Sequence, residues 1–311
     1  METIRKIPTK RRRSDLRKNY GLYLLALPAI LCALVFSYLP MLGIIIAFQR
    51  YDPFRGLWGS TFVGLDNFRF FFSGSEWLQV TLNTLYLNVI FIASGTLASI
   101  IVALMMTQIP NKPFVKVGQT LMTLPNFVSW ATIALFATAF LSSDGVINRV
   151  CEMLFGTKID FYSDPDVWPL TFSVIRIWKG AGWGAIIYMA SIIGIDPEIY
   201  EAARIDGASR LQSIFRITLP LISNMIVLLL IMNVGSIFRG DFGMLYPFIG
   251  DNSLLYPTTD VIDTYIFRAL RTSGDMGRNM AISLYQSFMG LVLILFTNAL
   301  ARRINKDAAL F

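Results

Sequence analysis

The sequence contains no histidine and two cysteines, Cys32 and Cys151, which are far apart and form no CxxC or CxxH pattern. Transition-metal sites and Ser-His or Cys-His nucleophiles require imidazole groups or clustered thiols. We therefore predict no metal site and no catalytic residues, so the chain is not expected to be an enzyme. Each cysteine is expected to behave as a small apolar residue.

A phosphate-binding loop for ATP is also missing. The segment from Gly59 to Gly64 has the glycine spacing of such a loop, but Leu65 stands where lysine is required. We therefore expect the chain to bind no cofactor. If ATP drives its activity, ATP and Mg²⁺ must be bound by another subunit.

Charge is scarce, because only 15% of the 311 residues are charged, whereas 55% are hydrophobic and 14% aromatic. Soluble domains contain about 25% charged residues, since water must cover their surface. The deficit here coincides with long uncharged runs, which indicates that lipid surrounds much of the chain. The sequence predicts an all-α integral membrane protein.

Six segments are apolar and long enough to cross a bilayer, which requires about 20 residues. They are 20–48, 82–107, 121–141, 168–194, 219–238 and 280–301. The first is longer than one span requires and contains Pro28 and Pro40, so it is expected to tilt, kink or project from the membrane.

The basic residues predict the orientation of these spans. Eight of the 27 Lys and Arg residues lie in residues 1–18, and eight more lie in later segments on the same predicted side, whereas the outer loops hold nine. Because cytoplasmic loops are enriched in Lys and Arg, both termini are placed in the cytoplasm. The expected organisation is a basic cytoplasmic tail (1–18), a six-helix transmembrane domain (19–303) and a cytoplasmic tail (304–311).

The connection at 196–220 has the features of a helical hairpin. Asp196 is a good N-cap, Pro197 a good first helical residue, and Gly207 allows a sharp turn. Ser209 can cap a second helix, and Pro220 is expected to open the next span. These propensities alone are equally consistent with an amphipathic loop that lies on lipid headgroups.

The order of residues in this connection resembles the EAA loop of permeases from binding-protein-dependent, type I ABC importers. The matching positions are Glu201, Ala202, Ala203, Asp206, Gly207, Ile217, Leu219 and Pro220. In that family the loop docks on a cytoplasmic ATPase. The resemblance therefore implies a coupling role for these eight residues and a six-helix permease fold.

Further stretches between residues 19 and 303 resemble the maltose-type branch, especially permeases for oligosaccharides and polysaccharide fragments in Gram-positive bacteria. They are 38–40, 64–68, 124–130, 177–184 and 261–265. The resemblance implies import of such a solute by alternating access. It also implies four kinds of partner: a second, homologous permease subunit, two ATP-binding-cassette subunits, an extracellular solute-binding lipoprotein and the oligosaccharide.

Span four contains two cations, Arg176 and Lys179, on one helical face. A charge within a span costs about 2.5–3.5 kcal/mol on insertion scales. The two side chains are expected either to face a cavity or partner, or to reach the outer interface by snorkelling. The nearby Gly180, Gly182 and Gly184 either kink the helix or allow close helix packing.

The family pattern places substrate contacts in spans three, four and five. It implies a sugar site formed by Ser129, Trp130, Trp178, Trp183, Asn233 and Ser236. Aromatic rings stack on the C–H faces of sugars, and amides or hydroxyls bind their hydroxyl groups. The tryptophans are also consistent with an interfacial belt.

Other functions fit the sequence less well. An ABC permease for glycerol phosphate or another small polar solute is one alternative. A secondary transporter would require an acidic residue or a broken-helix ion site within the membrane, and no acidic residue falls inside the six predicted spans. A membrane enzyme would require a carboxylate pair or a metal, and Asp160, Asp164 and Asp166 resemble an ordinary solvated loop.

Overall fold

The computed structural model describes residues 19–304, and helices account for most of them. The strands found there form one short antiparallel pair, β1 (Gln49–Arg50) and β2 (Thr61–Phe62), with Gln49 opposite Phe62. The predicted all-α membrane fold is confirmed. The predicted tail at residues 1–18, and residues 305–311 of the predicted C-terminal tail, lie outside the described part of the chain.

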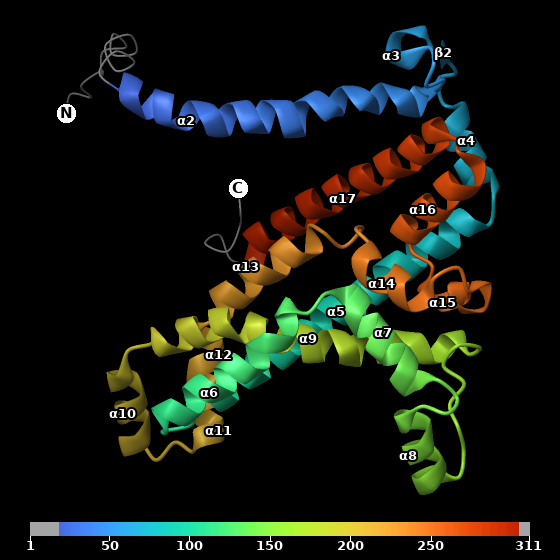
Figure 1. Cartoon of the computed structure of the whole chain (residues 1–311). Helices are drawn as coiled ribbons and strands as arrows, with labels where there is room; N and C mark the ends of the chain where they lie inside the picture. The colour runs from blue at the N-terminus through green and yellow to red at the C-terminus, as the bar shows by residue number, and fades with distance from the viewer. Residues whose placement is uncertain (1–18, 305–311) are drawn as a thin grey trace, which may run out of the picture.

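The first span is a continuous helical run of 29 residues, as its predicted limits imply. It comprises α2 (Tyr20–Ala33), a π-helical turn η1 (Leu34–Tyr38) and a 3₁₀ segment η2 (Leu39–Phe48). Proline lacks an N–H and crowds the preceding turn, which explains the wider turn just before Pro40. No residue of α2 is buried, and the helix lies apart from the other helices (Figure 1).

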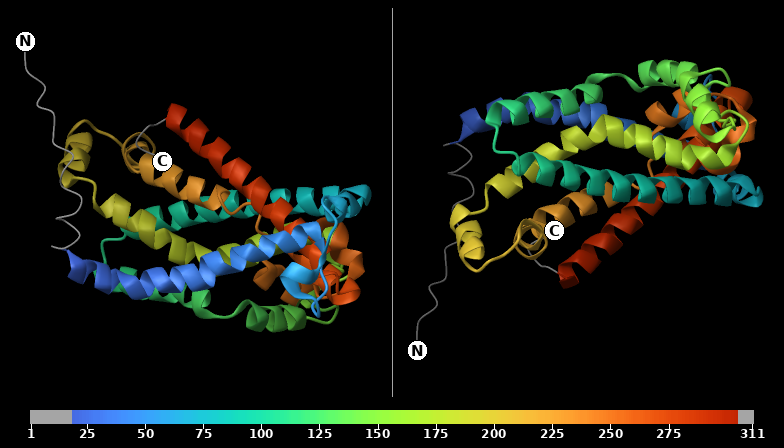
Figure 2. Two further views of the ribbon diagram at one scale, coloured as in Figure 1. Left: turned by 90° about the horizontal axis from the view of Figure 1, so that it is seen from above. Right: turned by 90° about the horizontal axis from the view of Figure 1, so that it is seen from below.

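The centre of the molecule is the pair α5 (Glu76–Thr107) and α9 (Trp168–Ile193), the second and fourth predicted spans. The two helices lie side by side over much of their length (Figures 1 and 2). The buried face of α5 includes Thr84, Phe91 and Ser99, and that of α9 includes Phe172 and Lys179. Polar groups are thus buried at this helix pair, against which α6 and α13 also pack.

The third span is not the single helix predicted for 121–141. It consists of α6 (Lys112–Thr123), the 3₁₀ turn η3 (Leu124–Phe127) and α7 (Trp130–Leu141), with extended backbone at Val128 and Ser129. The Ser129 hydroxyl accepts a hydrogen bond from Thr132 N (3.1 Å) and so begins a new helix. After α7 the chain turns into α8 (Val146–Phe155).

The fifth span also differs from the prediction. Its helix begins at α11 (Arg210–Ser213), continues through a π-helical turn η5 (Ile214–Thr218) and α12 (Leu219–Leu221), and bends by 59° before α13 (Ser223–Val234). Pro220 therefore lies inside a helix and does not open one. As at Pro40, a π-helical turn precedes the proline and relieves its steric conflict.

The sequence predicts six spans, but fewer helices in the described residues are both long enough and apolar enough to cross a membrane. Four helical segments qualify directly: 20–48, 76–107, 130–155 and 276–299, the last within α17 (Met276–Ile304). The bent pair in span five makes a fifth if it is counted as one span. Helix α9 has 26 residues but does not qualify, because Arg176, Lys179 and its glycines reduce its apolarity.

The short elements gather at the two ends of the long helices (Figure 1). One end, called the hairpin end, carries α10 (Pro197–Ile205) and α11. The other, called the loop end, carries α3 (Gly56–Gly59), α4 (Asp66–Ser73), α8, η4 (Pro165–Val167), α14 (Phe242–Ile249), η6 (Ser253–Leu255), α15 (Tyr256–Thr259) and α16 (Ile262–Ser273). The start of α2 and the end of α17 both lie toward the hairpin end (Figures 1 and 2).

The glycines of α9 allow close packing and do not kink it, since the helix is unbroken. A methyl group at Gly182 would overlap the backbone carbonyl of Met122, and one at Gly184 would meet the Ser99 hydroxyl. A methyl group at Gly180, in contrast, would have no atom within 4 Å. Gly182 thus sets the contact between α9 and α6, and Gly184 the contact between α9 and α5.

Lys179 stabilises the break in the third span through hydrogen bonds. Its ammonium donates hydrogen bonds to the backbone carbonyls of Asn126 (2.7 Å), Val128 (2.7 Å) and Pro125 (3.3 Å), and it lies 5.1 Å from the ring centre of Trp130. A helix end leaves carbonyl groups without partners and carries partial negative charge. A buried cation satisfies both requirements, so this lysine does not snorkel to the interface.

Replacing Gly182 with alanine should weaken the packing of α9 on α6. Overpacked sites lose about 1–3 kcal/mol, because the new methyl group can be accommodated only if backbone moves. We expect a lower thermal denaturation midpoint for purified Gly182→Ala protein and an unchanged midpoint for Gly180→Ala. Equal midpoints for the two variants would contradict the packing described for Gly182.

Replacing Lys179 with methionine should destabilise the protein by about 1–3 kcal/mol, because buried carbonyls at the break lose their donor. Thermal denaturation of the purified protein checks this. The matched control is Lys158→Met, since Lys158 is exposed at the loop end and forms surface ion pairs with Asp144 and Glu152. If both variants denature like the parent, Lys179 does not secure the break.

Candidate functional site

The connection at 196–220 folds into the predicted helical hairpin. The Asp196 side chain accepts a hydrogen bond from Glu198 N (3.0 Å), and Pro197 is the first residue of α10. This is the N-cap and first-residue pattern that the sequence predicts. The first arm of the hairpin, α10, therefore begins at Pro197, where the Asp196 cap fixes the start of the helix.

The turn between the two arms depends on Gly207, whose φ is +76°. Ala208 N donates to the Ala203 carbonyl (2.9 Å) and Gly207 N to the Arg204 carbonyl (3.1 Å), which closes α10 with a Schellman motif. Ser209 then caps α11 in a capping box with Gln212. The predicted turn and second cap are both confirmed.

One hydrogen bond between the arms does not follow from the sequence pattern. The Tyr200 hydroxyl lies 2.9 Å from the Thr218 hydroxyl, and Thr218 is buried. This bond joins α10 to the π-helical turn η5, which leads directly into the bent fifth span. The first arm of the hairpin is therefore directly hydrogen-bonded to the helix of that span.

The hairpin exposes large apolar side chains among charged ones. Glu201 and Ala202 are exposed, whereas Ala203 is buried between the arms, Ile217 and Leu219 are half-buried, and Asp206, Gly207 and Pro220 are exposed. Ile205, Leu211 and Phe215 are 86%, 67% and 66% exposed. Exposed large apolar side chains beside charged ones are typical of a protein interaction surface.

A second candidate site is a cavity of about 280 Å³ between α5, α9 and α13. Its polar lining groups are Thr96, Ser99, Arg176, Tyr188 and Asn233. Its remaining lining residues are apolar or glycine: Phe91, Ile92, Gly95, Gly180, Ala181, Gly184, Ile187 and Leu229. A concave surface with a few polar groups among apolar ones is the usual form of a small-molecule site.

Arg176 faces this cavity, which settles the alternatives left open by the sequence. Its Nη1 donates to Asp241 Oδ2 (3.1 Å), and its guanidinium carbon lies 4.9 Å from the ring centre of Phe91. The side chains of Arg176 and Asp241 remain 34% and 32% exposed. Arg176 is therefore a paired but accessible cation.

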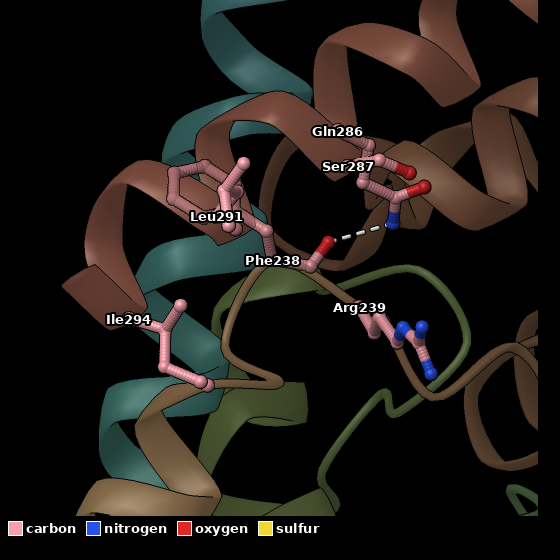
Figure 3. A pocket seen from close by; sticks show the side chains of 8 residues that line it. Phe238, Arg239, Gln286, Ser287, Leu291 and Ile294 are labelled. Carbon is pink, nitrogen blue, oxygen red and sulfur yellow. Dashed lines mark hydrogen bonds between the residues drawn. The ribbon is translucent and has the colours of Figure 1, made fainter. Parts of the chain in front are cut away.

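The loop that carries Asp241 is held by contacts with α16 and α17. The Asp263 carboxylate accepts hydrogen bonds from Gly240 N (2.6 Å) and Gln286 Nε2 (2.6 Å), and Gln286 also donates to the Phe238 carbonyl (2.6 Å; Figure 3). Burial raises the pKa of the Asp263 carboxyl, and these hydrogen bonds oppose the rise. Asp241 thus occupies a fixed position opposite Arg176.

The predicted sugar-contacting residues do not gather at one place. Asn233 lines the cavity, and the hydroxyl of the nearby Ser236 donates to the Asn233 carbonyl (2.9 Å). Trp178 is 55% exposed and lines a different, mainly apolar groove of about 700 Å³ between α7, α9 and the start of α8. Asn233 and Trp178 therefore face different spaces.

The other three predicted contacts lie at the break in the third span. Ser129 caps α7, Trp130 packs beside the Lys179 ammonium, and Trp183 is 51% exposed. The Trp183 ring meets the Phe127 ring edge-on, with centres 6.1 Å apart. These residues form a group with an exposed aromatic surface, separate from the lining of the cavity.

Sequence reasoning did not identify Thr96, Ser99 or Tyr188 as cavity residues. A signal for the first two was present, because small polar residues three positions apart share one face of a helix. In an apolar span such a pair indicates an inward-facing surface. Tyr188 follows Gly184 by one turn, and its direction depends on how α9 packs against α5.

Comparison with known proteins gives consistent results. Residues 95–309 match the family described as binding-protein-dependent transport system inner membrane component. Protein LplB of Bacillus subtilis (strain 168) is 36% identical over 293 residues, which cover 94% of this chain and 92% of LplB. The polygalacturonan/rhamnogalacturonan transport system permease protein YteP of the same strain is 35% identical over 287 residues, which cover 92% and 89%.

A solved structure shows the same fold. It is a bacterial alginate ABC transporter in complex with an alginate pentasaccharide-bound periplasmic protein. One of its chains superposes with a TM-score of 0.85 at 33% identity, covering 95% of this chain and 98% of that chain. The family match, the two relatives aligned over most of their length and the shared fold agree with the hairpin and the apolar helices described above. This multi-pass membrane protein therefore belongs to the inner membrane components of binding-protein-dependent transport systems.

Proposed function

We propose that this chain is the permease subunit of an ATP-driven importer and forms the path of an oligosaccharide or polysaccharide fragment across a bacterial cell membrane. An extracellular binding protein delivers the solute to the loop end. A cytoplasmic ATPase drives the switch between outward-facing and inward-facing states. Both termini lie in the cytoplasm, and the chain hydrolyses no ATP itself.

The observation that carries this proposal is the hairpin at 196–220. Its outer surface exposes large apolar side chains among charged ones. Its second arm, α11, is continuous with the helix of the fifth span, and its first arm, α10, is joined to that helix by the Tyr200–Thr218 hydrogen bond. An ATPase bound to this surface can bias the position of the span, and a solute bound between the spans can bias it too. Such reciprocal bias is the physical requirement for coupled transport.

The oligosaccharide class is supported by the names of two relatives and by the cavity. YteP is named for transport of polygalacturonan and rhamnogalacturonan, and the solved structure with the same fold is an alginate transporter. The cavity offers an amide, hydroxyls and a guanidinium, which are the groups that bind sugar hydroxyls and carboxylates. Asn233 and Ser236 in this region, and Ser129, Trp130, Trp178 and Trp183 elsewhere, remain the proposed sugar contacts.

The proposed assembly contains two permease subunits and two ATP-binding-cassette subunits, because each hairpin docks on one cassette. ATP and Mg²⁺ belong to the cassettes, and this chain binds no cofactor. The alginate transporter forms a complex with a periplasmic protein, which supports delivery by a binding protein here. A permease for glycerol phosphate or another small polar solute is the alternative within the same family.

Gly207→Val should uncouple transport from the ATPase. A β-branched residue at positive φ costs on the order of 1–3 kcal/mol, so the turn and the hairpin surface should distort. We expect the variant to insert in the membrane but to lose co-purification with the cassette and solute-stimulated ATP hydrolysis.

The matched control is Gly156→Val. Gly156 has a φ of +70° and follows α8 at the loop end, and a methyl group added at either glycine would have no atom within 4 Å. The control should carry similar backbone strain and retain the cassette. Retention of the cassette and of stimulated hydrolysis by Gly207→Val would remove the coupling role of the turn.

The orientation predicts which engineered cysteines are accessible from each side. In a variant without Cys32 and Cys151, cysteines at Lys112 and Ser209 should react with a membrane-impermeant thiol reagent only from the cytoplasm. One at Asp164 should react only from outside. The opposite pattern would place the hairpin on the wrong face for an ATPase.

A further inference from the structure

We propose that the transported oligosaccharide is anionic and that Arg176 binds one of its carboxylates in the cavity between α5, α9 and α13. This inference rests on the proposed function and adds the charge of the solute. It also assigns Arg176 a role in specificity. Arg176 is not among the sugar contacts that the family resemblance implies.

The charge of the cavity lining is the first observation. Within the part of the chain that the structure describes, Arg176 is the one lining residue with a full charge, and no carboxylate lines the cavity. The other polar groups are hydroxyls and an amide, which bind sugar hydroxyls of any oligosaccharide. Arg176 is therefore the lining group that can favour a negatively charged solute over a neutral one.

The unused hydrogen-bonding capacity of Arg176 is the second observation. A guanidinium has five N–H donors, and a carboxylate is bound best when it accepts two of them. Both hydrogen bonds of Arg176 within residues 19–304, to Asp241 Oδ2 (3.1 Å) and Met244 Sδ (3.7 Å), use the same nitrogen, Nη1. Nε and Nη2 remain available for a second, bidentate carboxylate.

Asp241 orients Arg176 without blocking it. Asp241 is not part of the cavity lining, and its other oxygen, Oδ1, caps α14 by accepting from Met244 N (3.2 Å). The loop on which it lies is tied to Asp263 and Gln286, and the side chain of Arg239 in this loop points away from Leu291 and Ile294 (Figure 3). The guanidinium is thus held over the Phe91 ring by one fixed anion.

The depth of Arg176 favours a role in the passage over one at the surface. It is the ninth residue of α9, which places it about 12 Å along the helix from the loop end at 1.5 Å per residue. Charged residues at such depths usually face a pathway or a partner. Because the Arg176 side chain remains 34% exposed, a carboxylate that enters the cavity can reach its guanidinium.

The test uses the complete complex with its second permease, cassettes and binding protein in lipid vesicles. Stimulation of ATP hydrolysis is measured against the concentration of uronic-acid oligosaccharides, namely oligogalacturonates and oligomannuronates, and against their methyl esters. The esters have the same sugar rings without the charge. We expect the acids to stimulate the parent complex at concentrations at least about tenfold lower than the esters.

Arg176→Gln should raise the half-maximal concentration for the acids by roughly tenfold or more, the scale expected for a lost hydrogen bond to a charged group. The value for the esters should change little, and Arg176→Lys should recover part of the preference. Asp241→Asn, which still caps α14, should shift the acids to lower concentrations because it frees the remaining donor of Arg176.

The matched control is Arg278→Gln. Arg278 also pairs with an aspartate, Asp275, at similar exposure, but lies at the loop end outside the cavity. It should leave the acid preference unchanged. The same binding protein is used throughout, and its own affinity for each sugar is measured separately.

Esters that stimulate the parent complex as well as the acids do would overturn the inference. So would an equal loss for acids and esters in Arg176→Gln, which would make Arg176 only a structural partner of Asp241. Stimulation by neutral oligosaccharides alone would leave the proposed function standing and refute the anionic solute. A complex that responds to no oligosaccharide would refute the proposed function, and this inference with it.

Discussion

Two cations in helix α9, Arg176 and Lys179, need polar partners within a largely apolar bundle, and two distant segments of the chain supply these partners. Lys179 donates hydrogen bonds to the backbone carbonyls where the third span breaks, and Arg176 pairs with the carboxylate that caps α14. Loss of the Lys179 ammonium would leave the carbonyls at the break without a donor, and loss of the Asp241 carboxylate would leave Arg176 without its ion-pair partner. The broken span and the loop before α14 are therefore held against the same central helix.

The coupling hairpin could be predicted in detail because its geometry is determined locally. The cap at Asp196, the first helical proline, the positive φ at Gly207 and the cap at Ser209 each follow from the chemistry of one residue and its near neighbours. The first span and its length follow in the same way from an uncharged run. Local rules are sufficient wherever no distant segment competes with them.

The breaks and the cavity could not be predicted, because they depend on distant partners. The interruption at Val128 and Ser129 is stabilised by Lys179, which lies 51 residues beyond Val128 in the chain. The cavity requires α5, α9 and α13 to meet, and Trp178 faces a different groove from Asn233. The apolarity of the sequence indicates roughly where the spans lie. It does not indicate where they bend or which helix faces pack together.

The central claim is that ATP hydrolysis on a partner subunit moves an oligosaccharide through this chain. Its most direct test is uptake of a labelled oligosaccharide into vesicles that contain the complete complex and its binding protein, with an ion gradient imposed or abolished independently. The account predicts accumulation that requires hydrolysable ATP and is indifferent to the gradient. Accumulation that follows the ion gradient without ATP would contradict it.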